Sequence, residues 1–169
     1  MNVIEAERLS LRRATTQDSA FILELVNDAA FIQNIGDRGV RSIADAEQYI
    51  QKRMMESYER LSYGMYVVEL KGTGTPIGIC GLVKRDTLPD TDIGFAFLPA
   101  YWAQGYAIES AKAVLAHAKN DIGLKRILGI TNPANEASIR VLEKLGLKFE
   151  RMIKFTEDGP ESKLFSIVF

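Results

Sequence analysis

The sequence of 169 residues has almost none of the side chains that disulfides and soft-metal sites need. Cys80 is the only cysteine and His117 the only histidine, which excludes an internal disulfide and a Cys- or His-rich set of metal ligands. Neither sign of charge is in excess, since 21 Lys and Arg residues face 22 Asp and Glu residues. A nucleic acid or an anionic membrane as main partner would require a basic excess. We therefore expect no metal site, no nucleic-acid partner and no membrane partner.

The sequence also has no long hydrophobic run, and we expect no leader segment. No apolar stretch is long enough to span a bilayer, and residues 1–7 lack the basic and apolar regions of a signal peptide. We expect a cytoplasmic location. Hydrophobic residues make up 47% and charged residues 25% of the chain, as in an average soluble protein. At this length we expect residues 1–169 to form a single domain with its own core.

The hydrophobic pattern indicates both strands and helices. Apolar and alternating stretches predict strands over 8–12, 63–70, 77–83, 92–98, 126–130, 148–155 and 163–169. Apolar residues at helical spacing predict two helices between residues 16 and 61, with a break at 34–39. They also predict a helix over 107–121 and a last helix that begins near Asn135 and ends at Gly146. This order predicts a mixed α/β fold in which helices cover a sheet with an antiparallel meander.

The turn that enters the helix at 107–121 has the features of an anion site. Residues 104–107 link that helix to the strand at 92–98, so several backbone N–H groups lie unpaired at the positive end of a helix. Such an end can bind phosphate or pyrophosphate. Gly105 permits a tight turn and Ala107 lets a ligand approach the backbone, although one glycine before a helix is also typical of an ordinary turn. The sequence contains neither a nucleotide P-loop nor a Gly-x-Gly-x-x-Gly pattern.

Two extended motifs resemble those of a known family. Residues 92–111, DIGFAFLPAYWAQGYAIESA, resemble the acetyl-coenzyme A (acetyl-CoA) motif of GNAT N-acetyltransferases. Residues 132–147, NPANEASIRVLEKLGL, resemble the helix that follows in that family, with its cap. Residues 8–12 and 78–82 match as well, and the branch resembled most includes the ribosomal-protein N-terminal acetyltransferases. The resemblance covers most of the chain. It implies a GNAT-like α/β fold, with a largely antiparallel central sheet and helices on both faces, and acetyl-CoA as co-substrate.

The resemblance also implies where the coenzyme binds. The backbone amides that would hold the pyrophosphate are those around Gln104, Gly105, Tyr106, Ala107 and Ile108. The strand that would pair its backbone with the pantetheine arm contains Phe95, Phe97 and Leu98. Asn135 matches a family position whose side chain contacts the coenzyme, and asparagine is also a preferred helix N-cap. These two roles of Asn135 are compatible.

The chemistry that this family performs is attack by a neutral amine on a thioester. At pH 7, deprotonation costs about 4.6 kcal/mol for a lysine amine and about 1.2 kcal/mol for an α-amine. Asp92 matches the family's acidic position and is the candidate base, directly or through a water; alternatively it only ends the loop before its strand. Many relatives place a tyrosine, as the acid, where this sequence has Leu142. Ser138 could donate a hydrogen bond to the sulfur instead, or satisfy the backbone as an ordinary first-turn serine.

The function expected from the resemblance is acetyl transfer to a primary amine by direct attack in a ternary complex. The acceptor would be a peptide or protein N-terminus or a small-molecule amine, and the acidic residues Asp86, Asp90 and Asp92 would suit a cationic one. Two alternatives stay open: a regulatory module that binds acyl-CoA without catalysis, and a GNAT enzyme with another acyl donor. We expect a monomer or homodimer, a buried and unreactive Cys80, and a solvated His117.

Overall fold

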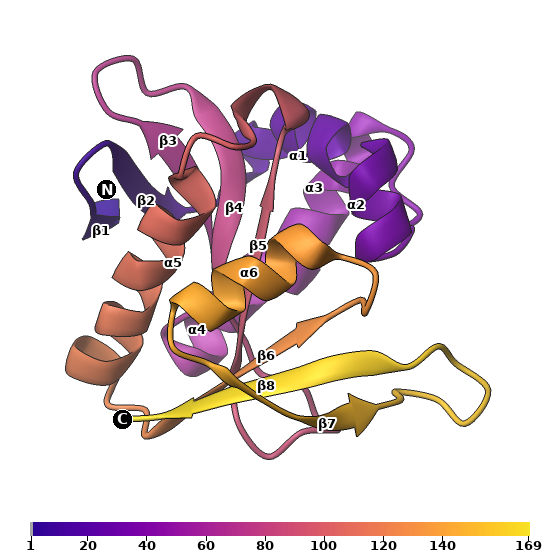
Figure 1. The fold of residues 1–169 in the computed structure, drawn as a ribbon. Helices are drawn as coiled ribbons and strands as arrows, with labels where there is room; N and C mark the ends of the chain where they lie inside the picture. Colours follow the sequence, from indigo (N-terminus) through magenta and orange to yellow (C-terminus); the bar gives the residue numbers. More distant parts are fainter. Residues whose placement is uncertain (1) are drawn as a thin grey trace.

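The structure is a computed structural model that describes residues 2–169. Its centre is one eight-stranded sheet in the order β1-β2-β3-β4-β5-β6-β8-β7 (Figure 1). Neighbouring strands are antiparallel except β5 and β6, which run parallel. The strands are β1 (Asn2–Glu5), β2 (Leu9–Arg13), β3 (Met65–Leu70), β4 (Pro76–Val83), β5 (Asp92–Phe97), β6 (Arg126–Thr131), β7 (Lys148–Ile153) and β8 (Ser162–Val168).

Helices cover both faces of this sheet. Figure 1 shows α5 and α6 in front of the strands and α1 to α4 on the other side. The helices of that other side are α1 (Ser19–Val26), α2 (Ala29–Asn34), α3 (Ile43–Tyr49) and α4 (Glu56–Leu61), with the π-helical segment η2 (Ile50–Met55) joining α3 to α4. Those in front are α5 (Tyr106–His117), extended by η4 (Ala118–Ile122), and α6 (Glu136–Lys144). Short turns of 3-10 helix, η1 (Thr16–Asp18) and η3 (Pro99–Tyr101), precede α1 and follow β5. Within residues 2–169, no helix combines the length and the apolar character needed to cross a lipid bilayer.

The packing of α5 fixes the position of the loop that precedes this helix in the chain. The central strands β3 and β4 are buried along most of their length because helices lie on both of their faces. α5 packs against β4 and β5 and buries Ala111, Val114 and Leu115. Ser110 is buried on the same helix, and its hydroxyl donates to the Tyr106 carbonyl oxygen at 2.8 Å, which satisfies a polar group in the core. The start of α5 is therefore fixed against the centre of the sheet.

The predicted fold class is confirmed, and the strands predicted between residues 8 and 169 all form. Two features of the first third of the chain are different. The segment Asn2–Glu5 forms an edge strand that the sequence pattern did not indicate. The first predicted helix is divided in two, because the Asn27 side chain donates to the Leu23 carbonyl oxygen and the Asp28 side chain caps α2 by accepting from Ala30. Such side chains compete with the backbone bonds of a continuous helix.

The predictions for Cys80 and His117, the only cysteine and the only histidine of the sequence, differ in how they agree with the structure. Cys80 is buried in β4, as expected, and burial raises the pKa of its thiol to about 12, which makes it a poor nucleophile. The expectation of a solvated His117 is wrong, because its side chain is only 13% exposed. Its ring lies 2.7 Å from the Asp121 carboxylate and edge-on to the buried ring of Tyr66. The helix continues beyond His117, so this residue packs between the helix and the sheet.

Candidate functional site

The parallel pair β5 and β6 separates soon after it begins. These strands pair only at Asp92–Leu128 and Ile93–Gly129, whereas β5 continues to Phe97 on its pairing with β4. In the part of the chain that the structure describes, residues 94–97 of β5 therefore have no strand partner on the β6 side, and we call them the open edge. Residues 94–96 are partly exposed although the strand lies in the middle of the sheet. An extended molecule that carries amide groups can pair with such an edge as a neighbouring strand would.

The direction of the backbone shows which groups of the open edge are free. The Leu98 N–H donates to the Ile77 carbonyl oxygen of β4, and the Leu128 N–H donates to the Thr91 carbonyl oxygen. Because these directions alternate along a strand, Phe95 and Phe97 turn their N–H and carbonyl groups toward the open side. Leu98 faces β4 instead, so its backbone N–H is already engaged.

Trp102 partly closes the end of the open edge. Its indole N–H donates to the Phe97 carbonyl oxygen at 2.8 Å, while the residue stays 48% exposed. The backbone groups left on the open side are therefore the Phe95 N–H and carbonyl and the Phe97 N–H. This indole bond ties the loop after β5 to the strand.

The loop before α5 leaves backbone donors exposed. Gly105 is the N-cap of α5, with φ +84° and no side-chain cap hydrogen bond, and Gln104 and Gly105 are exposed. Ala103 is also left-handed, with φ +59°. The first N–H groups of a helix have no partner within the helix, so those of Tyr106, Ala107 and Ile108 remain available at the positive end of its dipole. The predicted anion loop therefore exposes the kind of helix-end N–H groups that can bind a phosphate group.

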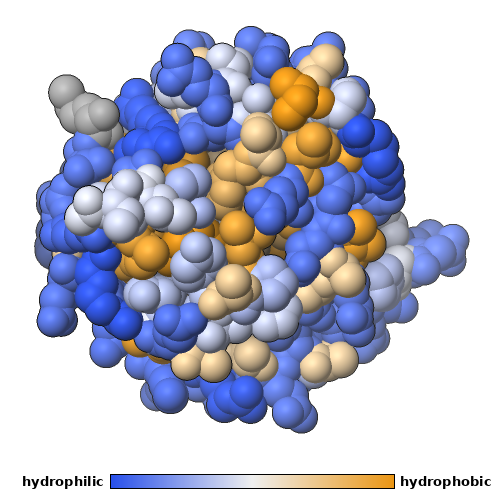
Figure 2. Space-filling view, turned by 90° about the horizontal axis from the view of Figure 1, so that it is seen from above, coloured by the Kyte–Doolittle hydropathy of each residue, from blue (hydrophilic) through white to orange (hydrophobic). Residues whose placement is uncertain are grey.

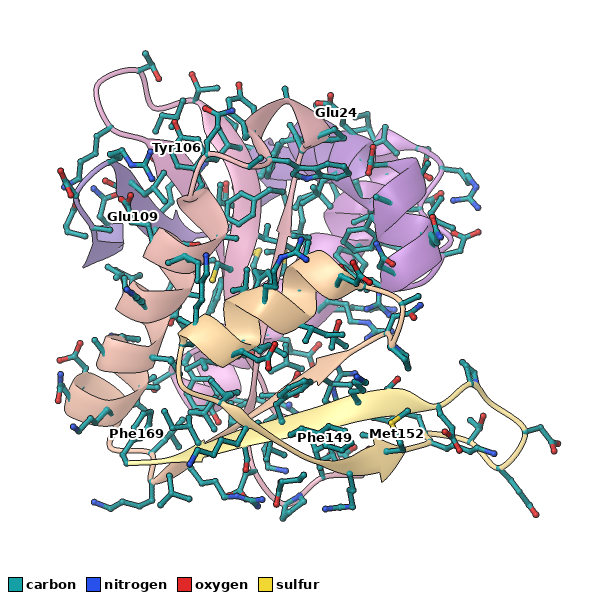
Figure 3. All side chains as sticks on the ribbon, in the orientation of Figure 1. Glu24, Tyr106, Glu109, Phe149, Met152 and Phe169 are labelled. Carbon is teal, nitrogen blue, oxygen red and sulfur yellow. The ribbon has the colours of Figure 1, made fainter. Side chains whose placement is uncertain are left out.

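An arginine from the other end of the chain lies against this loop. The Arg8 Nε donates to Glu109 Oε1 at 2.6 Å, and its backbone N–H donates to Glu109 Oε2 at 2.7 Å. Its Nη1 donates to the Gln104 carbonyl oxygen at 3.0 Å, and its guanidinium carbon lies 4.5 Å from the centre of the Tyr106 ring. Figure 3 shows Tyr106 and Glu109 at the start of α5, beside β1 and β2. Sequence reasoning missed this contact because Arg8 and Glu109 are 101 residues apart.

The start of α6 presents the two residues predicted from the second motif. Asn135 is the N-cap, and its Oδ1 accepts from the Ser138 N–H at 3.2 Å. The predicted capping role of Asn135 is therefore present, and its amide N–H groups have no acceptor within residues 2–169. The Ser138 side chain is half-buried and its hydroxyl is likewise without a hydrogen-bond partner in that part of the chain. Both groups can serve a ligand in front of the sheet.

The position at which many relatives carry a tyrosine belongs to the core here. Leu142 is 1% exposed and packs against Gly129 of β6, where even a Cβ atom would lie 2.8 Å from the Leu142 side chain. Leu147 packs against the same glycine. A larger polar side chain at 142 would have to displace this packing.

Asp92 lies where β5 and β6 still pair, at the closed end of the open edge. Its side chain is 4% exposed and its Oδ1 accepts from Arg85 Nε at 3.1 Å. Burial raises the pKa of Asp92 to about 6, although the charge of Arg85 favours the carboxylate. A carboxyl with a pKa raised by burial beside a specific charged partner is a candidate functional group. At neutral pH it is ionised and able to accept a proton.

The acidic residues near Asp92 do not form a free negative cluster. Asp90 is bound by Arg126 Nη1 at 2.9 Å, and Asp92 is bound by Arg85. Of the three carboxylates expected to suit a cationic acceptor, two are therefore neutralised by arginines. Asp86 is exposed in the loop between β4 and β5.

A separate groove lies beside the end of the open edge, on the side of α1. It has a volume of about 650 Å³ and is lined by Phe21, Glu24, Asn27, Asp28, Thr75, Pro76, Leu98, Pro99, Ala100 and Tyr101. Glu24 is exposed and has no ion pair or hydrogen bond within residues 2–169. Figure 3 places Glu24 at the same end of the molecule as Tyr106. Figure 2, which views this end from above, shows apolar side chains exposed among hydrophilic ones.

Known proteins are similar to this chain over most of its length. The family model for an Acetyltransferase (GNAT) domain matches residues 8–148. YnaD of Bacillus subtilis strain 168, an uncharacterized N-acetyltransferase, is 28% identical over 151 residues, which cover 89% of this chain and 85% of that protein. The uncharacterized protein YkkB of the same organism is 35% identical over 92 residues, so the match spans about half of each chain, 53% and 54%.

The fold is shared with a solved structure that contains coenzyme A. This structure is RimL, a ribosomal L7/L12 alpha-N-protein acetyltransferase in complex with coenzyme A. The TM-score is 0.85, and the superposition covers 98% of this chain and 97% of that one at 19% sequence identity. At this identity the similarity concerns the fold.

Proposed function

The chain belongs to the GNAT acetyltransferase family and is an acetyl-CoA-dependent acetyltransferase, and we propose that it acetylates a primary amine directly in a ternary complex. The observation that carries this proposal is the arrangement along β5. Uncapped helix N–H groups lie beyond one end of the open edge, and the buried carboxyl of Asp92 lies at the other. As part of the proposal, residues 1–169 act as one cytoplasmic domain, a monomer or homodimer, without nucleic acid or membrane.

The open edge of β5, the loop before α5 and the start of α6 offer hydrogen-bonding groups that fit the coenzyme. The N–H groups of residues 104–108 would hold its pyrophosphate, and Phe95 and Phe97 would pair with the amides of its pantetheine arm. Asn135 would donate its amide N–H groups while its Oδ1 caps α6. Acetyl-CoA supplies an acetyl thioester that a neutral amine can attack.

Asp92 is proposed as the base that takes the proton of the amine. Its pKa of about 6 lies closer to neutrality than that of an ordinary aspartate, near 3.9, and this favours proton transfer at physiological pH. Because its side chain is almost fully buried, we propose that a water carries the proton from the amine to Asp92. Arg85 would hold the carboxylate in place.

Direct transfer, without an acetylated enzyme intermediate, is also supported by the burial of the cysteine thiol. Cys80 is the only cysteine, and burial raises its thiol pKa to about 12, so it is unsuited to carry an acetyl group. The hydroxyl of Ser138 is proposed to donate a hydrogen bond to the sulfur as the thiolate leaves. No tyrosine acid is needed at Leu142, since a thiol is a far better leaving group than an alcohol.

The body of the acceptor is proposed to occupy the groove beside α1, with its amine extended along β5 toward Asp92, which lies at the other end of that strand. Its carboxylates, Glu24 and Asp28, suit a cationic amine, and Leu98 connects the groove to the open edge. RimL, which shares the fold, is named for acetylation of a protein α-amine. An α-amine also loses its proton at a cost about 3.4 kcal/mol lower than a lysine amine. A peptide N-terminus is therefore our first choice of acceptor, and a small-molecule amine the second.

The experiment is thiol release from acetyl-CoA in the presence of different amines, with mass spectrometry of the products. The panel contains peptides with free N-termini, lysine peptides, polyamines and aminoglycosides. We expect transfer to one class, and a Glu24→Gln variant should raise the KM for that amine while leaving coenzyme affinity unchanged. Glu47→Gln, which removes an exposed carboxylate from α3, is the matched control. Coenzyme binding without transfer to any amine would support a non-catalytic module, and transfer only from a different acyl-CoA would correct the donor.

A further inference from the structure

The guanidinium group of Arg8 has one nitrogen more than its contacts in the described part of the chain use. Nε and Nη1 are engaged by Glu109 and by the Gln104 carbonyl oxygen. Nη2 has no acceptor within residues 2–169. This nitrogen lies 3.2 Å from the position that a Cβ of Gly105 would occupy, so it points at the backbone of the anion loop. The side chain is 45% exposed and is open to a ligand.

The partners of Arg8 hold its guanidinium in one place. The Glu109 carboxylate is only 17% exposed, and both of its oxygens bind Arg8, one through the side chain and one through the backbone N–H. The Tyr106 ring lies against the guanidinium, whose central carbon is 4.5 Å from the centre of the ring. An arginine restrained in this way has already lost much of the freedom that binding would otherwise remove.

The position of Glu109 in the first turn of α5 explains why this restraint matters. A carboxylate there competes with an anionic ligand for the positive end of the helix. Arg8 neutralises that carboxylate and leaves Nη2 beside Gly105, where the anion would sit. Guanidinium groups bind phosphate oxygens with strong, charge-assisted hydrogen bonds.

We propose that Arg8 binds the pyrophosphate of the coenzyme through Nη2, with Glu109 and the Gln104 carbonyl as the groups that orient it. This inference rests on the proposed function, because it assigns a residue to the same coenzyme site. It adds one cationic side chain, that of the residue just before β2, to a pyrophosphate site otherwise made of backbone N–H groups.

Calorimetric titration with coenzyme A and with 3′-dephospho-coenzyme A tests the proposal without requiring turnover. Arg8→Gln should weaken binding of both ligands equally, by about tenfold or more, since a hydrogen bond to a charged group is lost. Arg126→Gln is the matched control, because Arg126 is also a partly exposed arginine held by carboxylates, those of Asp90 and Glu150, but lies at the opposite end of the parallel strands. The control should bind like the wild type.

Three results would overturn the proposal. Unchanged affinity in a folded Arg8→Gln variant would mean that Arg8 is not part of the site. If that variant does not fold, Arg8→Lys, which keeps the charge but not the planar set of donors, takes its place in the same measurement. A loss confined to coenzyme A would assign Arg8 to the 3′-phosphate. Restored affinity in the double variant Arg8→Gln/Glu109→Gln would mean that Arg8 only neutralises Glu109. Failure of the wild type to bind either ligand would instead refute the proposed function.

Discussion

Replacing Asp92 by asparagine should make the protein more stable at neutral pH and less active. The carboxyl is buried where β5 and β6 pair, and burial raises its pKa from an unfolded value near 3.8 to about 6. The folded protein therefore holds this proton more tightly than the unfolded chain does. An asparagine keeps the shape of the side chain without the cost of burying a charge.

The sign and size of the effect follow from proton linkage. The wild type loses stability as pH rises from about 3.8 to about 6, because over this range the folded state binds more protons than the unfolded state. A pKa difference of about 2 corresponds to about 3 kcal/mol, of which about 2 kcal/mol falls between about pH 4.5 and about pH 7.5. The advantage of Asp92→Asn over the wild type should grow by that amount, or about 4–8 °C in Tm.

Urea unfolding of both proteins between about pH 4.5 and about pH 7.5 measures this difference. The interaction with Arg85 is already contained in the pKa of about 6, so the difference between a neutral Asp92 and an asparagine adds only an offset that does not vary with pH. Asp90→Asn, which removes a partly exposed carboxylate from the neighbouring loop, controls for the change in net charge. Turnover of Asp92→Asn should fall by about 100-fold or more, as expected for loss of a general base, with coenzyme affinity intact. A stability difference independent of pH would refute the burial argument, and wild-type turnover would retire Asp92 as the base.

Three further changes test other parts of the site. Gly105→Val should abolish coenzyme binding, because φ +84° disfavours a β-branched residue and the new Cβ would meet the Arg8 side chain. Gly123→Val is the control: Gly123 has φ +85° and lies in open space beyond the same helix, so this variant carries the same backbone strain and should leave the calorimetric affinity unchanged. Ser138→Ala should lower kcat severalfold at unchanged coenzyme affinity, and an unaltered kcat would leave the serine with a structural role only. Leu142→Ala should cost about 2–5 kcal/mol in urea unfolding, and a loss below about 1 kcal/mol would contradict its place in the core.

The sequence predicts those features that depend on local pattern. The strands and the turn at Gly105 follow from alternation, glycine and helix-end rules, and the two motifs around β5 and α6 indicated the family. The prediction that Asn135 caps α6 is confirmed because capping is decided within a few residues. The division of the first helix at Asn27 and Asp28 is also local, but it depends on side-chain bonds that periodicity does not reveal.

The features that the sequence does not predict are contacts between distant segments. Arg8 reaches Glu109 only because β2 and α5 are brought together by the sheet. Trp102 engages the carbonyl of Phe97 through an indole bond that depends on the turn between them. The acidic residues around Asp92 look like a negative cluster in the sequence, and only the fold shows that Arg85 and Arg126 neutralise two of them. Electrostatic interpretation of a motif therefore requires the three-dimensional partners.

A crystal structure of the complex with coenzyme A would test the central claim most directly. We predict that pyrophosphate oxygens lie within hydrogen-bond distance of the N–H groups of residues 105–108, and that the pantetheine amides pair with Phe95 and Phe97 along the open edge. The sulfur should lie in front of the sheet, near Ser138. A coenzyme bound elsewhere, or phosphates that do not contact the first turn of α5, would contradict the account.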